Sequence, residues 1–198
     1  MREHPILFNG EMVRATMERR KTQTRRPMRQ QPMVDDSCML EPNMARSPFG
    51  TPGDRLWVRE TFAVLSDQTN GLGYSCDLLG HAYAADPFAR YGEWDSDFAI
   101  DVQDIRWRPS IHMPRAASRT TLTVKRVWAE RVQDITEADA AAEGVRPGDT
   151  TDGGSCIQLG FVDAWDGIYA ARGLGWDANP WVWACEFEID NAKEPDHA

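Results

Sequence analysis

The hydrophobic positions near the start of the chain predict a short strand followed by a helix. Residues 5–8 form the apolar run Pro-Ile-Leu-Phe, which is typical of a buried strand. Asn9 is a favourable N-cap, and apolar side chains then recur at helical spacing as far as Arg20. Because Pro27 cannot continue a helix, we expect an extended or loop backbone between Lys21 and Pro27.

The remainder of the chain contains three further strand patterns and two further helix patterns. Alternating apolar positions predict strands over residues 55–64 (long or bent), 120–128 and 181–189. Thr136 is a second N-cap and precedes an Ala-rich helix, residues 137–143, that Gly144 ends. A third helix is predicted over about 158–172, where apolar side chains share one face.

Strands interspersed with helices, without a regular strand–helix–strand alternation, indicate the α+β class. We expect a single domain over residues 1–198, built as a small mixed β-barrel with helices packed outside it. Residues 28–52 and 66–106 are rich in turn-forming and polar residues and show little periodicity. Since long structureless loops are uncommon in compact domains, we expect both segments to be insertions.

Charge is unevenly distributed along the chain. The 198 residues carry a net charge of -9, yet residues 1–29 hold eight Lys and Arg against three Glu, and residues 134–198 hold three Lys and Arg against fourteen Asp and Glu. A basic segment in an acidic chain suits a local anionic ligand better than a long DNA duplex, which needs many phosphate contacts. A solvated helix face is the alternative explanation.

Several features predict a cytoplasmic protein. No apolar run approaches the ~20 residues of a membrane span, and the first residues do not resemble a signal peptide. Four widely spaced cysteines without a CxxC pair indicate reduced thiols.

Familiar catalytic and cofactor motifs are missing from the sequence. Cys76 and His81 have no second pair of ligands nearby, so we expect no metal. The sequence has no G-x-S-x-G, which argues against a Ser/His/Asp hydrolase. Residues 71–73 (GLG) lack the strand–turn–helix context of a dinucleotide site, and we expect no cofactor.

The segment around Lys21 is the remaining candidate for chemistry. A lysine acts as a nucleophile or base when its pKa falls from about 10.4 toward neutrality, which requires burial and neighbouring positive charge. Arginines at positions 19, 20, 25 and 26 supply that charge, and Thr24 supplies a hydroxyl. The alternative is a cationic surface that binds phosphate.

Three segments together form a recognisable pattern: residues 20–26 (RKTQTRR), 53–60 (GDRLWVRE) and 134–144 (DITEADAAAEG). They resemble the ASCH domain family, whose domains are similar to PUA domains. Residues 5–26, 107–143 and 176–187 look more closely like the long ASCH-type proteins that bacteriophages and prophages encode. The resemblance implies a small β-barrel with flanking helices and a cleft that binds RNA or a nucleoside.

One branch of this family removes the acetyl group from N4-acetylcytidine by means of a lysine, a threonine and a glutamate. These match Lys21, Thr24 and Glu143. The resemblance implies Lys21 as nucleophile or base, Thr24 as its partner and Glu143 as acid or base. The chain departs from the family at Arg19, where a glycine usually ends the helix.

Arg25, Arg26 and Trp176 are the candidate substrate-binding residues. Arg26 would stabilise an oxyanion or hold a phosphate, and Trp94 and Trp176 lie in predicted loops where an indole can stack on a base. The expected partner is a modified nucleoside or a short single-stranded RNA. Two other functions stay open, a non-catalytic reader of RNA or a modified base and a ribonuclease. An enzyme requires Lys21 to be desolvated and in contact with the glutamate, whereas a reader requires exposed cations.

Overall fold

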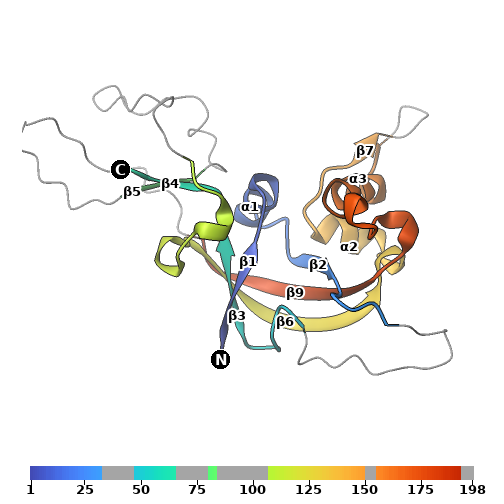
Figure 1. Cartoon of the computed structure of the whole chain (residues 1–198), viewed down its shortest axis with the longest axis horizontal. Coiled ribbons are helices and arrows are strands. Elements are labelled where there is room, and N and C mark those ends of the chain that lie inside the picture. Colours follow the sequence, from blue (N-terminus) through green and yellow to red (C-terminus); the bar gives the residue numbers. More distant parts are fainter. Residues whose placement is uncertain (33–46, 66–79, 84–106, 150–154, 193–198) are drawn as a thin grey trace, which may run out of the picture.

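The computed structural model describes residues 1–32, 47–65, 80–83, 107–149 and 155–192. At its centre is a five-stranded mixed sheet with the strand order β1-β3-β6-β9-β2 (Figure 1). Its strands are β1 (Glu3–Leu7), β2 (Gln23–Pro27), β3 (Arg55–Arg59), β6 (Thr120–Arg131) and β9 (Trp181–Ala192). β1 and β3 are parallel, and the other neighbours are antiparallel. This sheet and its helices confirm the α+β class.

The described strands form an open sheet, whereas the sequence predicts a closed barrel. β1 and β2 are the two edges, since each has one neighbour in this sheet. The strand predicted over 55–64 is in fact two strands, because β4 (Phe62–Leu65) leaves the sheet and pairs with β5 (Gly80–Tyr83). At the bend between β3 and β4, the buried Glu60 carboxylate accepts two hydrogen bonds from Arg119, at 2.9 and 3.0 Å.

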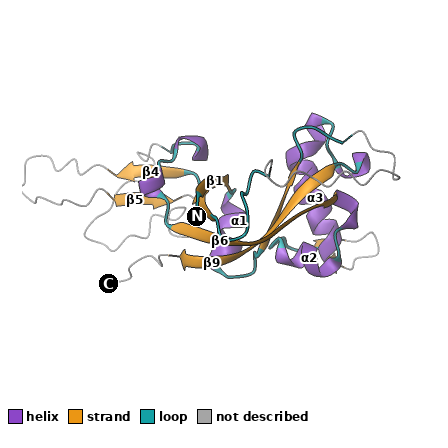
Figure 2. Cartoon of the chain, turned by 90° about the horizontal axis from the view of Figure 1, so that it is seen from below, coloured by secondary structure: helices purple, strands orange, loops and turns teal. Residues whose placement is uncertain are grey.

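The described part of the chain contains three α-helices, α1 (Gly10–Met17), α2 (Glu137–Ala142) and α3 (Ile157–Tyr169). Both predicted N-caps are confirmed, since Asn9 Oδ1 accepts from the amide of Met12 at 2.8 Å and Thr136 Oγ1 from that of Asp139 at 3.2 Å. Figures 1 and 2 place α2 and α3 at one end of the molecule and β4 and β5 at the other. No helix in the described part of the chain is long and apolar enough to cross a lipid bilayer.

Shorter elements connect these helices and strands. β7 (Gly148–Asp149) and β8 (Ser155–Cys156) form a small hairpin before α3. Among the described residues, the 3₁₀ helices are Ser110–His112, Arg115–Ala117, Val132–Asp134, Ala170–Arg172 and Trp176–Ala178.

Two large hydrophobic clusters hold the helices against the strands. The main cluster joins α1 to four strands through Ile6, Phe8, Val13, Leu56, Val58, Leu122, Val124, Val127, Trp183, Cys185, Phe187 and Ile189. Met28 and Phe49 also belong to it, so both ends of the expected insertion 28–52 contribute to the core. The second cluster joins α2 and α3 through Val132, Ile135, Ala140, Phe161, Trp165, Tyr169 and Val182. Of the two expected insertions, residues 33–46, 66–79 and 84–106 lie outside the described part.

Candidate active site

The turn after α1 directs Lys21 into the protein. The helix ends in a Schellman motif, in which the amide of Arg20 donates to the carbonyl of Ala15 and that of Arg19 to the carbonyl of Thr16, both at 2.9 Å. Arg19 has a φ of 58°, the left-handed conformation that a glycine adopts with less strain. Arginine therefore ends the helix at the position where the resemblance to ASCH domains predicts a glycine. The amide of Lys21 also donates to Ala15, at 3.0 Å, so the chain reverses direction just before β2.

The end of α2 packs closely against this turn and brings Glu143 to Lys21. Glu143 is the C-cap of α2, and Gly144 follows it with a φ of 75°. A Cβ atom at Gly144 would lie 2.7 Å from Cβ of Ala15 and 2.8 Å from Cβ of Lys21. The Arg20 guanidinium donates to the carbonyl of Gly144 at 2.9 Å. Glycine is thus required at this position by both its backbone conformation and the close approach.

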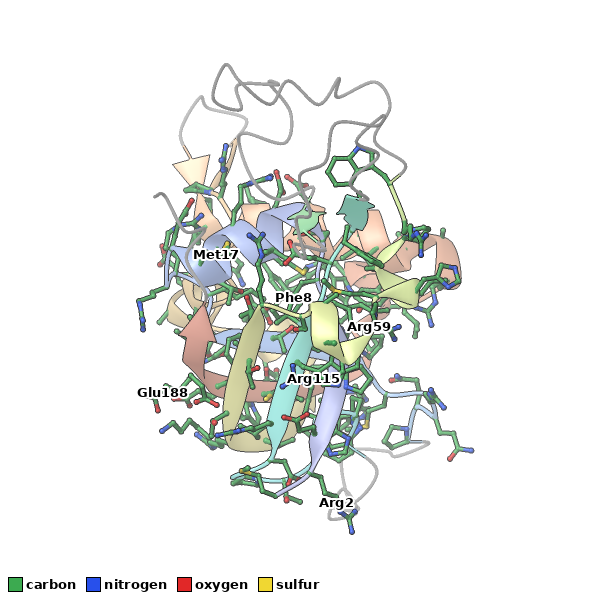
Figure 3. All side chains as sticks on the ribbon, turned by 90° about the vertical axis from the view of Figure 1, so that its left-hand side faces the viewer. Arg2, Phe8, Met17, Arg59, Arg115 and Glu188 are labelled. Atoms are coloured by element: carbon green, nitrogen blue, oxygen red, sulfur yellow. The ribbon has the colours of Figure 1, made fainter. Side chains whose placement is uncertain are left out.

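The Lys21 side chain is 0% exposed, and its ammonium group has a full set of acceptors. Nζ donates to Oε2 of Glu143 at 2.7 Å, to the carbonyl of Glu143 at 2.9 Å and to the carbonyl of Gln23 at 2.8 Å. The ring of Phe8 lies 5.3 Å from Nζ, and Figure 3 shows Phe8 in the interior, below α1. Since an ammonium has three N–H donors, Lys21 is satisfied as a cation.

Burial is the main influence on the pKa of Lys21 and lowers it. The Glu143 carboxylate opposes this effect and raises the pKa, whereas the guanidinium groups of Arg26 and Arg25 lower it. Burial and neighbouring positive charge are the two conditions that a lysine needs to act as a base. Glu143 is itself buried, at 5% exposed, so the two charges meet away from bulk water, where their attraction is stronger.

Arg25 holds the second oxygen of the Glu143 carboxylate. Its side chain is fully buried, with Nη1 3.2 Å from Oε1 of Glu143 and Nε donating to Oε1 of Glu130 at 2.7 Å. Nη1 also donates to Oε1 of Gln23 at 3.1 Å, and Nη2 lies 3.8 Å from Oδ2 of Asp139. Arg25 is a predicted substrate-binding residue. Its Nε and Nη1 are engaged by protein side chains, whereas its buried Nη2 has no hydrogen-bond acceptor in the described part of the chain.

Sequence analysis did not single out Gln23, Glu130 and Asp139, which complete the surroundings of Arg25. Two spacings in the sequence could have identified Gln23 and Asp139. Gln23 and Arg25 are two residues apart on one strand and share a sheet face. Asp139 and Glu143 are four residues apart and share a helix face. Glu130 lies beyond the end predicted for its strand, because β6 continues as far as residue 131.

Thr24 faces the other side of β2, where Cys185 of β9 is its strand partner. Thr24 is fully buried, and its hydroxyl accepts a hydrogen bond from Nη1 of Arg26 at 3.2 Å. Within the described residues no direct hydrogen bond joins Thr24 to Lys21 or Glu143. Burial, followed by the negative charge of Glu143, raises the pKa of the Cys185 thiol to about 12. The structure therefore brings Lys21 and Glu143 into contact. Thr24 and Arg26 lie on the other face of β2, and the Arg26 guanidinium is close enough to lower the pKa of Lys21.

Trp176 packs against the second hydrophobic cluster. Its ring packs edge-on against Phe161 of α3, with the ring centroids 6.2 Å apart, and its amide donates to Oδ1 of Asp166 at 2.6 Å. Among the described residues no contact joins it to Lys21 or Glu143. The other predicted stacking residue, Trp94, lies outside the described part.

The described residues include no group of three or more His, Cys, Asp and Glu side chains placed to hold a metal ion. Cys76, named above as a possible ligand, lies outside them. What the site does contain is an amine, a carboxylate, a hydroxyl and two guanidinium groups. An amine and a carboxylate in contact can exchange a proton, which gives a base and an acid together.

Comparison of the chain with protein-family models, with curated proteins and with solved structures found no match. The chemistry of the buried side chains, together with the sequence motifs, is therefore the basis for a functional assignment.

Proposed function

We propose that this protein is an amidohydrolase of the ASCH type, which removes the acyl group from an N4-acylated cytidine. The observation that carries the proposal is the 2.7 Å contact between the fully buried amine of Lys21 and the carboxylate of Glu143. This contact favours an enzyme over a reader, whose cations would be exposed to the ligand. The sequence resemblance supplies the substrate class.

Amide hydrolysis needs a base for the nucleophile and an acid for the leaving amine. Transfer of one proton from Lys21 Nζ to Glu143 Oε2 gives a neutral amine and a neutral carboxylic acid side by side. The amine takes a proton from a water molecule as the water oxygen bonds to the acyl carbon. Glu143 gives its proton to N4 of the cytidine as the carbon–nitrogen bond breaks. The products are a carboxylic acid and cytidine, and both side chains return to their charged forms.

Thr24 and Arg26 complete the proposed site. The Thr24 hydroxyl accepts from Arg26, which leaves its own proton for donation to the water or to the acyl oxygen. Arg26 is half-buried, and its charge would stabilise the oxyanion that forms on the acyl group. Because Lys21 has no exposed surface in this conformation, the acyl group reaches it only after the site opens locally.

Incubation with N4-acetylcytidine and with longer N4-acylcytidines, followed by chromatography of the released cytidine, tests the proposal. Lys21→Arg keeps the positive charge but removes an amine that can lose a proton near neutral pH, so turnover should fall by about 100-fold or more. Glu143→Gln removes the acid and should cause a similar loss. Lys125→Arg is the matched control, since it makes the same change at an exposed lysine of β6 and should keep wild-type turnover.

Unchanged turnover in Lys21→Arg would contradict this mechanism. The same proteins are also incubated with short single-stranded RNAs. RNA cleavage that depends on Lys21 would replace the proposal with a ribonuclease. Binding of an acylated cytidine without any product, by wild type and Lys21→Arg alike, would replace it with a reader.

A further inference from the structure

We propose that Arg25 is a positioning residue, which fixes the Glu143 carboxylate so that one of its oxygens faces the Lys21 amine. The inference rests on the function proposed above, but its test needs no substrate. Two cations share the carboxylate: Lys21 Nζ contacts Oε2 at 2.7 Å, and Arg25 Nη1 contacts Oε1 at 3.2 Å. Each oxygen therefore has its own partner.

A second contact matters because the terminal torsion of a glutamate is broad. Held at one oxygen alone, the Glu143 carboxylate can rotate about this torsion, and the oxygen at Lys21 then turns away. A hydrogen bond to the other oxygen removes that freedom. Arg25 is suited to this task, since its planar guanidinium presents donors in a fixed fork.

Arg25 is in turn held from the side of β6. Its Nε donates to Oε1 of Glu130 at 2.7 Å, and Oε2 of Glu130 accepts from Nε1 of Trp128 at 2.6 Å. The Trp128 ring lies 5.9 Å from Cζ of Arg25, and Gln23 accepts from Nη1 at 3.1 Å. A continuous set of contacts thus runs from Trp128 through Glu130 and Arg25 to Glu143.

The charges around Arg25 explain why an arginine is needed there. A guanidinium with no exposed surface requires carboxylate partners, and Glu130, Asp139 and Glu143 all lie within 3.8 Å of it. A lysine at this position would keep the charge, but its single nitrogen cannot reproduce the fork between Glu130 and Glu143. Arg25→Lys therefore keeps the positive charge but removes the fork of donors.

The wild-type chain has three lysines, at positions 21, 125 and 193, and each Arg→Lys variant adds a fourth, so the ¹³C resonance of each lysine Cε can be followed in a pH titration by NMR. Glu143→Gln provides the reference, because the carboxylate raises the pKa of Lys21 and its loss should lower the titration midpoint of Lys21. Arg25→Lys should lower this midpoint toward that of Glu143→Gln, by about one pH unit or more, since it releases the carboxylate. Lys125 reports on the rest of the fold and should titrate as in wild type.

Arg26→Lys is the matched control for Arg25→Lys. Arg26 also lies within electrostatic range of Lys21, but its hydrogen bonds go to Thr24 and to the backbone of Leu7 and Arg25. Arg26→Lys should therefore leave the midpoint of Lys21 near its wild-type value. An unchanged midpoint in Arg25→Lys, or an equal change in both variants, would overturn the proposal.

Two variants of Glu130 provide the test if Arg25→Lys does not fold. Glu130→Gln and Glu130→Ala remove the same charge, but only glutamine keeps an oxygen that accepts from Arg25 Nε. A lower Lys21 midpoint in Glu130→Ala than in Glu130→Gln supports the positioning role, and equal midpoints would overturn it. A changed midpoint combined with no hydrolysis of acylated cytidine contradicts the proposed function alone, so the two proposals fail separately.

Discussion

Substitution of Gly144 by alanine tests how the contact between Lys21 and Glu143 is built. Gly144 has a φ of 75°, and an added Cβ would lie 2.7 Å from Cβ of Ala15, 2.8 Å from Cβ of Lys21 and 3.2 Å from Cα of Lys21. None of these atoms is the far end of a flexible side chain. The backbone of α2 or of the turn before β2 must therefore shift, and we expect Gly144→Ala to destabilise the protein.

Two contributions set the size of this effect. A left-handed conformation costs an L-residue about 1–2 kcal/mol, of which about 0.5–1 kcal/mol is offset because alanine loses less backbone entropy than glycine on folding. Overpacking of an interior contact typically costs a further 1–3 kcal/mol, roughly. The free energy of unfolding should therefore fall by about 1–4 kcal/mol, with the packing contribution as the larger part.

Gly173→Ala is the control that separates the two contributions. Gly173 has a similar φ of 69°, but nothing lies within 4 Å of its added Cβ. Urea unfolding, followed by tryptophan fluorescence, should show a difference of about 1–3 kcal/mol between the two variants. Equal destabilisation would refute the reasoning, because it would mean that α2 moves away from Lys21 without cost.

Three further outcomes follow from single contacts. Arg19→Gly should stabilise the protein by about 0.5–1 kcal/mol in urea unfolding, because glycine relieves the left-handed strain at φ 58°; a loss of stability would contradict that interpretation. The hydrogen bond from the amide of Arg2 is the main cause that lowers the pKa of Asp54 to about 2. The stability that this carboxylate contributes is therefore present above its ordinary pKa of 3.8 and is lost as the pH falls through about 2. Asp54→Asn should therefore lose less of its free energy of unfolding than wild type as the pH falls, as measured by urea unfolding. Parallel pH profiles of this free energy for the two proteins would contradict the contribution of Asp54. Burial raises the pKa of Cys185 to about 12, whereas Cys156 is half-exposed. Iodoacetamide at about pH 8 should therefore label Cys156 and spare Cys185 in the native protein, as measured by mass spectrometry. Rapid labelling of Cys185 would contradict its burial.

Local patterns predicted the individual elements better than their arrangement. Asn9 and Thr136 marked the starts of α1 and α2 because an N-cap depends on residues within one turn. The break in the predicted strand 55–64 could not be predicted from a local pattern. It coincides with the ion pair between Glu60 and Arg119, which are far apart in the sequence, and alternation along one strand carries no information about such a partner.

The sequence identified side chains of the candidate site, but only part of their arrangement. The resemblance named Lys21 and Glu143, and the structure places them in contact although 122 positions separate them. It did not reveal that Arg25 faces Glu143, since a run of basic residues indicates positive charge without indicating which residue faces inward. The carboxylates that surround Arg25 come from β6 and α2, and their convergence depends on tertiary packing.

The two adjacent arginines of β2 therefore have different expected roles, for a reason that lies in the strand itself. Successive side chains of a strand point to opposite faces, so Arg25 turns with Gln23 toward the carboxylates of α2, and Arg26 turns with Thr24 toward the other face. Both guanidinium groups lower the pKa of Lys21, after the larger effect of its burial. Because Arg25 is fully buried and Arg26 is half-buried, loss of Arg25 should act on the protonation of Lys21 through Glu143. Loss of Arg26 should act instead on the affinity for an anionic or developing negative group of the substrate. One residue of spacing thus separates the cation that we propose organises the site from the cation that we propose contacts a ligand.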